Sequence, residues 1–178
     1  MASAPATVEL EVTRTACAGA AAAYLVRKLG KHAGTYEGGL VDRVLHELAS
    51  QKQGEDVSLV ARWFTQRTSE LARLGHRVGA RLVAFRTPSI LDWVASGSGH
   101  RGAVLMTAGE LLHPGSGIQT PHAIAVAVDS SKRPGIDSLV AMDPWPGMGR
   151  MAPLPGTLER AHKRCLNRAI LLYSYGWS

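Results

Sequence analysis

Apolar side chains recur every three or four positions through the first part of the chain, which is the spacing of an amphipathic α-helix. This spacing predicts helices over residues 18–30, 38–50 and 56–74. Gly30 and Gly75 stand at the ends of the first and third of these segments, and glycine is the residue that most often terminates a helix. We therefore expect a helical first part whose first and third helices end at these two glycines.

The pattern changes near residue 79, where short apolar runs and alternating residues indicate β-strands. Predicted strands cover residues 79–85, 102–107, 122–128, 138–142 and 168–175, and predicted helices cover 89–95 and 157–166. Helices followed by strands are typical of an α+β fold with a largely antiparallel sheet. With 178 residues, of which 46% are hydrophobic, the chain is expected to form a single domain over residues 1–178.

Two connections in the second part are long and rich in glycine and proline, residues 109–121 and 143–156. Loops of this length in a compact domain are commonly functional, so we expect them to form the walls of a binding groove. A third glycine-rich stretch, GSGHRG at 97–102, has the glycine spacing of a dinucleotide-binding loop. Such a loop follows a strand and precedes a helix. Here the predicted order is reversed, so we interpret the stretch as a plain turn into a strand.

The segment HAIAVAVDSSKRPGIDSLVAMDPW, residues 122–145, places two apolar strands around a loop with the composition of a hairpin. If the hairpin is symmetric about its centre, Val126 lies opposite Leu139 and His122 lies opposite Asp143. Opposed residues have Cβ atoms about 4.5–5.5 Å apart, so an imidazole N–H could reach the carboxylate. An acid that orients a histidine is the pairing that a nucleophilic triad requires. The alternative interpretation is a strand-end pair in which the aspartate begins a turn, and a one-residue slip in register would separate the two.

Cys17 stands between a polar stretch and the alanine-rich start of the first predicted helix. The N-terminus of a helix presents unpaired N–H groups and the positive end of the helix dipole, which together favour the thiolate form of a cysteine. The position therefore suits a nucleophile, although a small residue packed in the core is the alternative for this stretch taken alone. Together with His122 and Asp143, Cys17 completes a predicted Cys-His-Asp triad.

Cysteine usage and hydropathy argue against several other classes of protein. The chain has two cysteines, Cys17 and Cys165, and no Cys-x-x-Cys pair, which favours a reducing cytoplasmic compartment and leaves a disulfide between them open. His162 and Cys165 share a helical face without a second pair at ligand spacing, so we expect neither a metal site nor a cofactor. Residues 16–26 are apolar but flanked by charges, so we expect no cleaved signal peptide and no transmembrane segment. Secretion as an effector without a cleaved signal stays open.

The formal net charge of +6 raises the question of an anionic partner. Lysine and arginine residues gather near 73–86 and 160–168, but no known nucleic-acid-binding motif accompanies them. We therefore expect a solvated basic surface, and nucleic-acid binding is only a weaker, third alternative.

These features together resemble a papain-like cysteine peptidase, and the nearest family is that of the bacterial double-glycine leader peptidases. The resemblance rests on a cysteine that opens the first helix, a helical first part, a hydrophobic strand headed by histidine, and an Asp-Pro after the next strand. Its residues are Cys17, Gly19, His122, Asp143, Pro144 and Trp145. It implies a papain-like fold in which the nucleophile helix packs on the sheet. It also implies that Cys17 is the nucleophile, His122 the general base and acid, and Asp143 its orienter, with Gly19 and Trp145 at the substrate groove.

The same resemblance implies the partners of the protein. The family processes bacteriocin precursors and often forms the N-terminal domain of an ABC exporter. The implied substrate is thus a peptide or protein with a glycine-rich leader, and the implied partner is an exporter encoded separately.

The chain departs from the family pattern around the nucleophile. The family usually has Asp-Cys-Gly-Pro there, whereas this chain has Ala-Cys-Ala-Gly at residues 16–19. The family also has a glutamine six residues before the cysteine, whose amide completes the oxyanion hole with the backbone N–H of the cysteine. That position is Glu11, and a charged carboxylate cannot donate a hydrogen bond.

Three explanations of this departure are open. Another group near Cys17 supplies the donor, Glu11 is held neutral, or the domain has lost peptidase activity and is a peptide-binding module. The candidate donors are Thr13, Arg14 and Thr15. An acyltransferase that uses the same triad and thioester is a further alternative.

Overall fold

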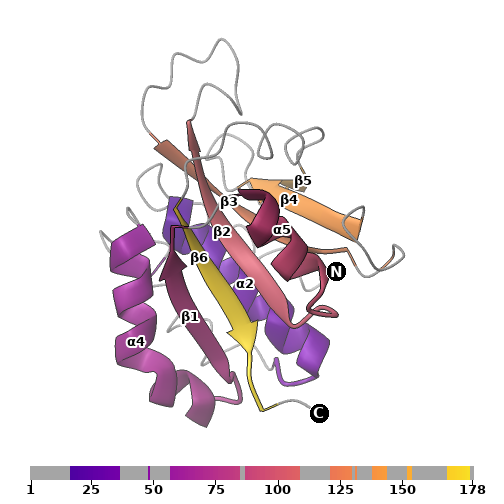
Figure 1. Cartoon of the computed structure of the whole chain (residues 1–178). Helices are drawn as coiled ribbons and strands as arrows, with labels where there is room; N and C mark the ends of the chain where they lie inside the picture. The colour runs from indigo at the N-terminus through magenta and orange to yellow at the C-terminus, as the bar shows by residue number, and fades with distance from the viewer. Residues whose placement is uncertain are drawn as a thin grey trace.

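A computed structural model of the chain gives the arrangement of its helices and strands (Figure 1). It describes residues 17–36, 48, 57–84, 87–108, 121–129, 131, 138–143, 152–153 and 168–176. Within these residues the chain combines helices with one antiparallel sheet.

The described helices are α2 (Cys17–Ala33), α4 (Val57–Arg73) and α5 (Thr87–Ala95). The strands are β1 (Val78–Val83), β2 (Arg101–Ala108), β3 (Pro121–Val128), β4 (Leu139–Asp143), β5 (Ala152–Pro153) and β6 (Ala169–Ser174). They form a six-stranded sheet in the order β1-β6-β2-β3-β4-β5, and every neighbouring pair is antiparallel. The predicted α+β class with an antiparallel sheet is thus confirmed.

Two predicted helices lie wholly or mostly outside the described residues. Of the helix predicted over 38–50, only Leu48 is described, where it is helical and buried. The helix predicted over 157–166 is not described at all. β5 is a strand that the sequence analysis missed, because its two residues fall in the stretch 143–156 that we interpreted as a loop.

The prediction that α2 ends at Gly30 is wrong. The helix continues to Ala33, and the residue that leaves it is Gly34, with φ of 74°. The N–H of Thr35 donates to the Gly30 carbonyl at 2.9 Å and the N–H of Gly34 to the Lys31 carbonyl at 3.2 Å, which is the Schellman pattern. Gly30 has a different role, because a Cβ at this position would collide with the imidazole of His76.

The prediction that Gly75 ends the preceding helix, α4, is confirmed. Gly75 has φ of 88°, its N–H donates to the Ala72 carbonyl, and the N–H of His76 donates to the Leu71 carbonyl at 2.8 Å. This is a second Schellman motif. The ends of α2 and α4 therefore meet at His76.

The turn predicted within residues 97–102 is also confirmed, since it connects α5 to β2. Ser98 and Gly99 have consecutive positive φ angles of 51° and 86°, and the N–H of His100 donates to the Gly97 carbonyl at 2.9 Å. A helix precedes the stretch and a strand follows it, so the order is the reverse of that in a dinucleotide-binding loop.

The sheet carries helices on both faces. α2 packs across β3, β2 and β6, and α4 packs on β1 beside it, whereas α5 covers β2, β3 and β4 from the opposite face (Figure 1). Each face has its own buried apolar cluster. Among the described helices, none combines the length and the apolar character that crossing a bilayer requires.

Alternation along β3 explains how the helices fit. Ala123, Ala125 and Ala127 face α2, whereas Ile124 and Val126 belong to the cluster beneath α5. The small alanines allow the α2 backbone to approach the sheet closely, and the larger residues fill the space under the shorter helix.

Candidate active site

Cys17 is the first residue of α2, so its predicted position at a helix start is confirmed. The side chain is 5% exposed, belongs to the apolar cluster on the α2 face, and is a free thiol. The helix start directs backbone N–H groups toward any negative charge that develops beside it. The burial of the sulfur means that a substrate can reach it only if the covering groups give way.

Contacts along α2 define its direction against the sheet. Near its end, the ring of His32 lies 4.6 Å from the ring of His100, which directly precedes β2. Further back, Leu25 packs against Gly102 of β2, where a Cβ would be 2.8 Å from Leu25 Cδ2. α2 therefore runs antiparallel to β2 and parallel to β3.

This direction places Cys17 at a definite level of the sheet. The eight residues from Cys17 to Leu25 span about 12 Å of helix, which equals the length of three to four strand residues. Cys17 thus lies near the level of Met106 in β2 and Ala123 in β3, which both pack with its cluster. His122 is the neighbour of Ala123 at the start of β3.

The hairpin register that we predicted is wrong by two residues. The structure pairs Val126 with Ala141 and Val128 with Leu139, rather than Val126 with Leu139. When this register is continued along the strands, Asp143 lies directly opposite residue 124. His122 is then a diagonal neighbour of Asp143 rather than its direct partner. Directly opposed and diagonal partners lie on the same face, and diagonal neighbours are about 7–8 Å apart.

Asp129 takes part in two hydrogen bonds that fit the observed register, one through its backbone N–H and one through its carboxylate. The N–H of Asp129 donates to the Ser138 carbonyl at 2.7 Å, which closes the hairpin one pair beyond Val128 and Leu139. The Asp129 carboxylate also accepts from the N–H of Ser131 at 3.0 Å and starts the loop with an Asx turn. The loop is therefore not centred where composition alone suggested.

The alternation of β3 also decides which face position 122 belongs to. Alternate residues of a strand share a face, so position 122 shares the face of Ile124 and Val126, which pack under α5. The alanines between them lie on the other face, against α2. The side chains of His122 and Asp143 are outside the described part of the structure. Their backbone positions lie at the strand ends nearest the start of α2.

The remaining predicted site residues are placed only in part. Gly19 lies in the first turn of α2 and is buried. Glu11 and Trp145 are outside the described residues, as are most residues of the two predicted groove loops. The groove itself therefore stays a prediction.

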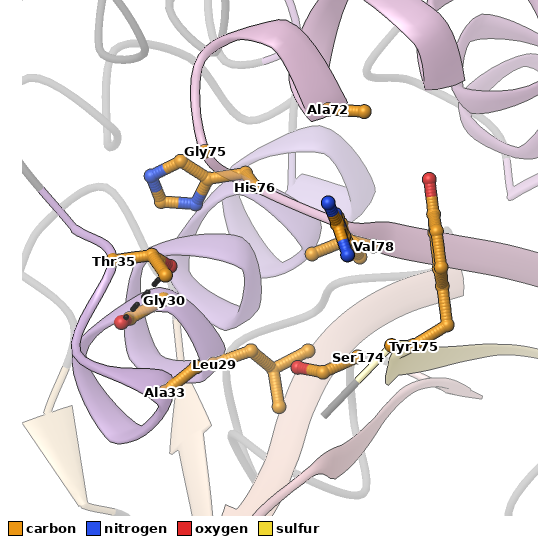
Figure 2. A pocket seen from close by; sticks show the side chains of 12 residues that line it. Leu29, Gly30, Ala33, Thr35, Ala72, Gly75, His76, Val78, Ser174 and Tyr175 are labelled. Carbon is orange, nitrogen blue, oxygen red and sulfur yellow. Dashed lines mark hydrogen bonds between the residues drawn. The ribbon is translucent and has the colours of Figure 1, made fainter. Parts of the chain in front are cut away.

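A cavity of about 320 Å³ lies at the opposite end of α2 (Figure 2). Its walls come from the ends of α2, α4 and β6, and none of the predicted triad residues lines it. His76 is 1% exposed and stands beside Gly30 and Thr35 on one side of the cavity, while Tyr175 stands on the other (Figure 2). His76 follows a helix end, where surface residues are common, so its place in the sequence gives no sign of this burial.

A pair of histidines is also brought together near this end. His32 and His100 meet edge to face, and burial together with the nearby His32 lowers the pKa of His100 below its ordinary value. No sequence pattern links residues 68 positions apart. Within the described part of the chain, no group of three or more His, Cys, Asp or Glu side chains is arranged to hold a metal ion.

Comparisons with known proteins do not identify a family. A scan against protein-family models found no match, and neither did searches of curated proteins and of solved structures.

Proposed function

We propose that the protein is a papain-like cysteine peptidase that cleaves a peptide bond through Cys17, His122 and Asp143. The observation that carries the proposal is the start of α2 at Cys17, at the end of an antiparallel sheet where His122 is the second residue of β3 and Asp143 the last residue of β4. Three residues far apart in sequence thereby belong to one end of the fold. No cofactor or metal enters the reaction.

Each residue has a defined chemical role in this reaction. The Cys17 sulfur attacks the carbonyl carbon of the scissile bond, and its proton passes to His122. His122 then protonates the departing amine, which leaves a thioester on the cysteine. Water attacks the thioester while His122 takes its proton, and the C–S bond breaks to release the acid and restore the thiol. Asp143 orients the imidazole and stabilises its charged form.

The register of the hairpin sets a geometric requirement for this role. Because position 122 has the parity of the α5 face, its imidazole must reach Cys17 past the end of β3 rather than through the sheet. His122 is the second residue of β3, so only Pro121 separates it from the strand end around which the imidazole has to pass. A sulfur and an imidazole separated by more than about 6 Å in a substrate complex would contradict the proposal.

The substrate class follows from the resemblance to the leader peptidases. A glycine-rich leader is narrow, and the residues that follow Cys17 in α2 are small and buried. The loops 109–121 and 143–156 would form the groove walls, with Trp145 against the peptide and a separately encoded exporter as the partner. The backbone N–H of Cys17 would be one oxyanion donor, and Glu11 occupies the position from which the second usually comes.

Alkylation kinetics test the nucleophile directly. Iodoacetamide near neutral pH should modify Cys17 at least about tenfold faster than Cys165, as measured by mass spectrometry of the digested protein. The rate at Cys17 should fall in His122→Ala. It should be unchanged in His32→Gln, which alters a histidine at the far end of α2. Equal, slow labelling of both thiols would contradict the triad.

Acyl-enzyme trapping separates hydrolysis from acyl transfer. A peptide ester ending in Gly-Gly should acylate Cys17, and the intermediate should be resolved by water at a rate that added amines do not increase. Acceleration by an amine, with the amide as product, would identify an acyltransferase that uses the same thioester.

The burial of Cys17 favours one other candidate function, a peptide-binding module without catalytic activity. Glu11 favours it as well, since a carboxylate there repels an oxyanion. In that case Cys17→Ala should bind a leader peptide as tightly as the unaltered protein, and neither should turn it over.

A further inference from the structure

A row of planar side chains crosses one face of the sheet, at the end remote from Cys17. Tyr173 of β6 lies directly opposite Gly79 of β1 on one side and Arg101 of β2 on the other. The guanidinium carbon of Arg101 is 4.8 Å from the centre of the Trp93 ring in α5. We term Tyr173, Arg101 and Trp93 the aromatic row.

The structure holds each member of the aromatic row in place. A Cβ on Gly79 would be 2.5 Å from Tyr173 Cζ, so the tyrosine ring lies across the backbone of β1 in the space that glycine leaves. Arg101 Nη1 donates to the Trp93 carbonyl and to the Ser96 hydroxyl, both at 3.0 Å. Planar groups that are already ordered lose little conformational entropy when a ligand binds.

The aromatic row borders a shallow hollow. The hollow measures about 260 Å³ and is lined by Trp93, His100, Arg101, Tyr173 and Ser174. α5 packs over β2, β3 and β4, and Figure 1 shows β1 and the final half of β6 without a described helix in front of them. Small-molecule sites usually enclose about 300–1,000 Å³. A hollow of this size can take one ring, while the rest of the ligand lies on the surface.

Basic side chains flank the aromatic row. Arg81 is exposed and stands two residues beyond Gly79 on β1, on the face that Val83 shares with the α5 cluster. Arg77 is exposed directly before β1. Asp92 carries the opposite charge. It is exposed on α5 and precedes Trp93 in the sequence. The whole chain has a net charge of +6, so an anionic ligand is favoured.

We propose that the aromatic row is a binding site for single-stranded nucleic acid, in which one base stacks on Tyr173 within the hollow and the adjoining phosphates lie along Arg81. An aromatic ring on a sheet face beside arginine binds a single strand by stacking that tolerates any base, and Tyr173 beside Arg81 and Arg101 provides this combination. An acidic peptide would satisfy the charges and leave the ring of Tyr173 unused. The residues come from β1, β6, β2 and α5 and form no contiguous motif, so the sequence alone favours this function only weakly.

The site is independent of the proposed peptidase activity. Cys17→Ser should therefore bind nucleic acid like the unaltered chain. Loss of one function would leave the other standing.

Fluorescence anisotropy with a labelled single-stranded RNA of about 12 mixed-sequence nucleotides tests the proposal on the full chain. Tyr173→Leu keeps an apolar cover over Gly79 and removes the aromatic ring, so its affinity should fall by about 5- to 150-fold. In a plot of log binding constant against log salt concentration, Arg81→Gln should reduce the magnitude of the slope by about 0.7. This is the change expected when one phosphate contact on a single strand is lost. Arg73→Gln removes an equal charge from the exposed surface of α4, on the opposite face, and should leave that slope unchanged.

Several results would overturn the proposal. These are the absence of binding at about 50 mM salt, unchanged affinity in a folded Tyr173→Leu, and equal salt slopes for Arg81→Gln and Arg73→Gln. If polyglutamate competes as strongly as the unlabelled strand, charge alone is recognised. If a mononucleotide competes as strongly, the site recognises a free nucleotide rather than a strand. If circular dichroism shows that Tyr173→Leu does not fold, Arg81→Gln still decides, because its side chain is exposed.

Discussion

We expect Gly30→Ala to lower the stability of the protein, although helix propensity alone predicts that it would raise it. Gly30 lies inside α2, where alanine is ordinarily more stable than glycine by about 0.8–1 kcal/mol. A Cβ at this position would enter the imidazole of His76, which is 1% exposed and cannot swing into solvent without unpacking the ends of two helices. Overpacking of this kind costs about 1–3 kcal/mol. The net effect is a loss of about 1 kcal/mol, which lowers the Tm by about 2–4 °C for a chain of this size.

A double-mutant cycle isolates this contact. In the His76→Ala background the collision partner is gone, so Gly30→Ala should now raise the free energy of unfolding by about 1 kcal/mol. Gly34→Ala is the matched control, because its Cβ would meet nothing within 4 Å while its φ of 74° disfavours alanine. It should destabilise equally in both backgrounds. If Gly30→Ala stabilises the unaltered chain in thermal or urea unfolding, the close packing of His76 on α2 is refuted.

Three further predictions concern the core, a histidine and the proposed oxyanion hole. Leu25→Ala removes a side chain with 0% exposure and should lower the free energy of unfolding by about 2–5 kcal/mol in urea titrations; a loss below about 1 kcal/mol would contradict its place against the sheet. The lowered pKa of His100 means that the unfolded chain takes up a proton before the folded chain does. Stability should therefore fall as the pH drops from about 6.5 toward the lowered folded value, and this part of the pH dependence should vanish in His100→Gln. Glu11→Gln should raise the rate of peptide cleavage by about 10²- to 10³-fold if an oxyanion donor is missing, and an unchanged kcat would assign the donor to another group.

Local patterns predicted most of the described elements, because each helix and strand is determined largely by its own periodicity and its own turn residues. Gly75 ends α4 as predicted, since a positive φ directly after a helix suits glycine. The same argument predicted the wrong helix end at Gly30. Its missing side chain makes room for His76, a residue 46 positions away, and only the folded structure brings the two together.

The hairpin register shows a different limit. Shifting one strand by two residues keeps every side chain on its face, so the apolar pattern of β3 and β4 fits the predicted and the observed register equally well. The register depends instead on how the loop closes, here through Asp129 and Ser138. Composition identifies such a loop as a turn, but it does not show which pair of residues closes it.

The aromatic row illustrates the same limit for a binding surface. Gly79, Tyr173 and Arg101 are neighbours only because β6 lies between β1 and β2, a pairing of the last strand with the first two. A linear search for basic residues beside aromatic ones does not detect a ring that lies over a glycine on the adjacent strand. Such a site could have been predicted from the sequence only if the strand order had been known.

The faces of the sheet to which positions 122 and 143 belong limit how the proposed triad can form. A one-residue slip would have put His122 and Asp143 on opposite faces of the sheet, whereas the observed two-residue shift keeps both positions on the face of Ile124 and moves them from direct opposition to a diagonal. Cys17 belongs to the other face, so the imidazole has to bridge the two at the end of β3. Catalysis through these residues therefore requires β3 to begin where it does. An insertion between His122 and Ala123 would put His122 and Asp143 on opposite faces of the sheet and should therefore abolish cleavage with little change in secondary structure.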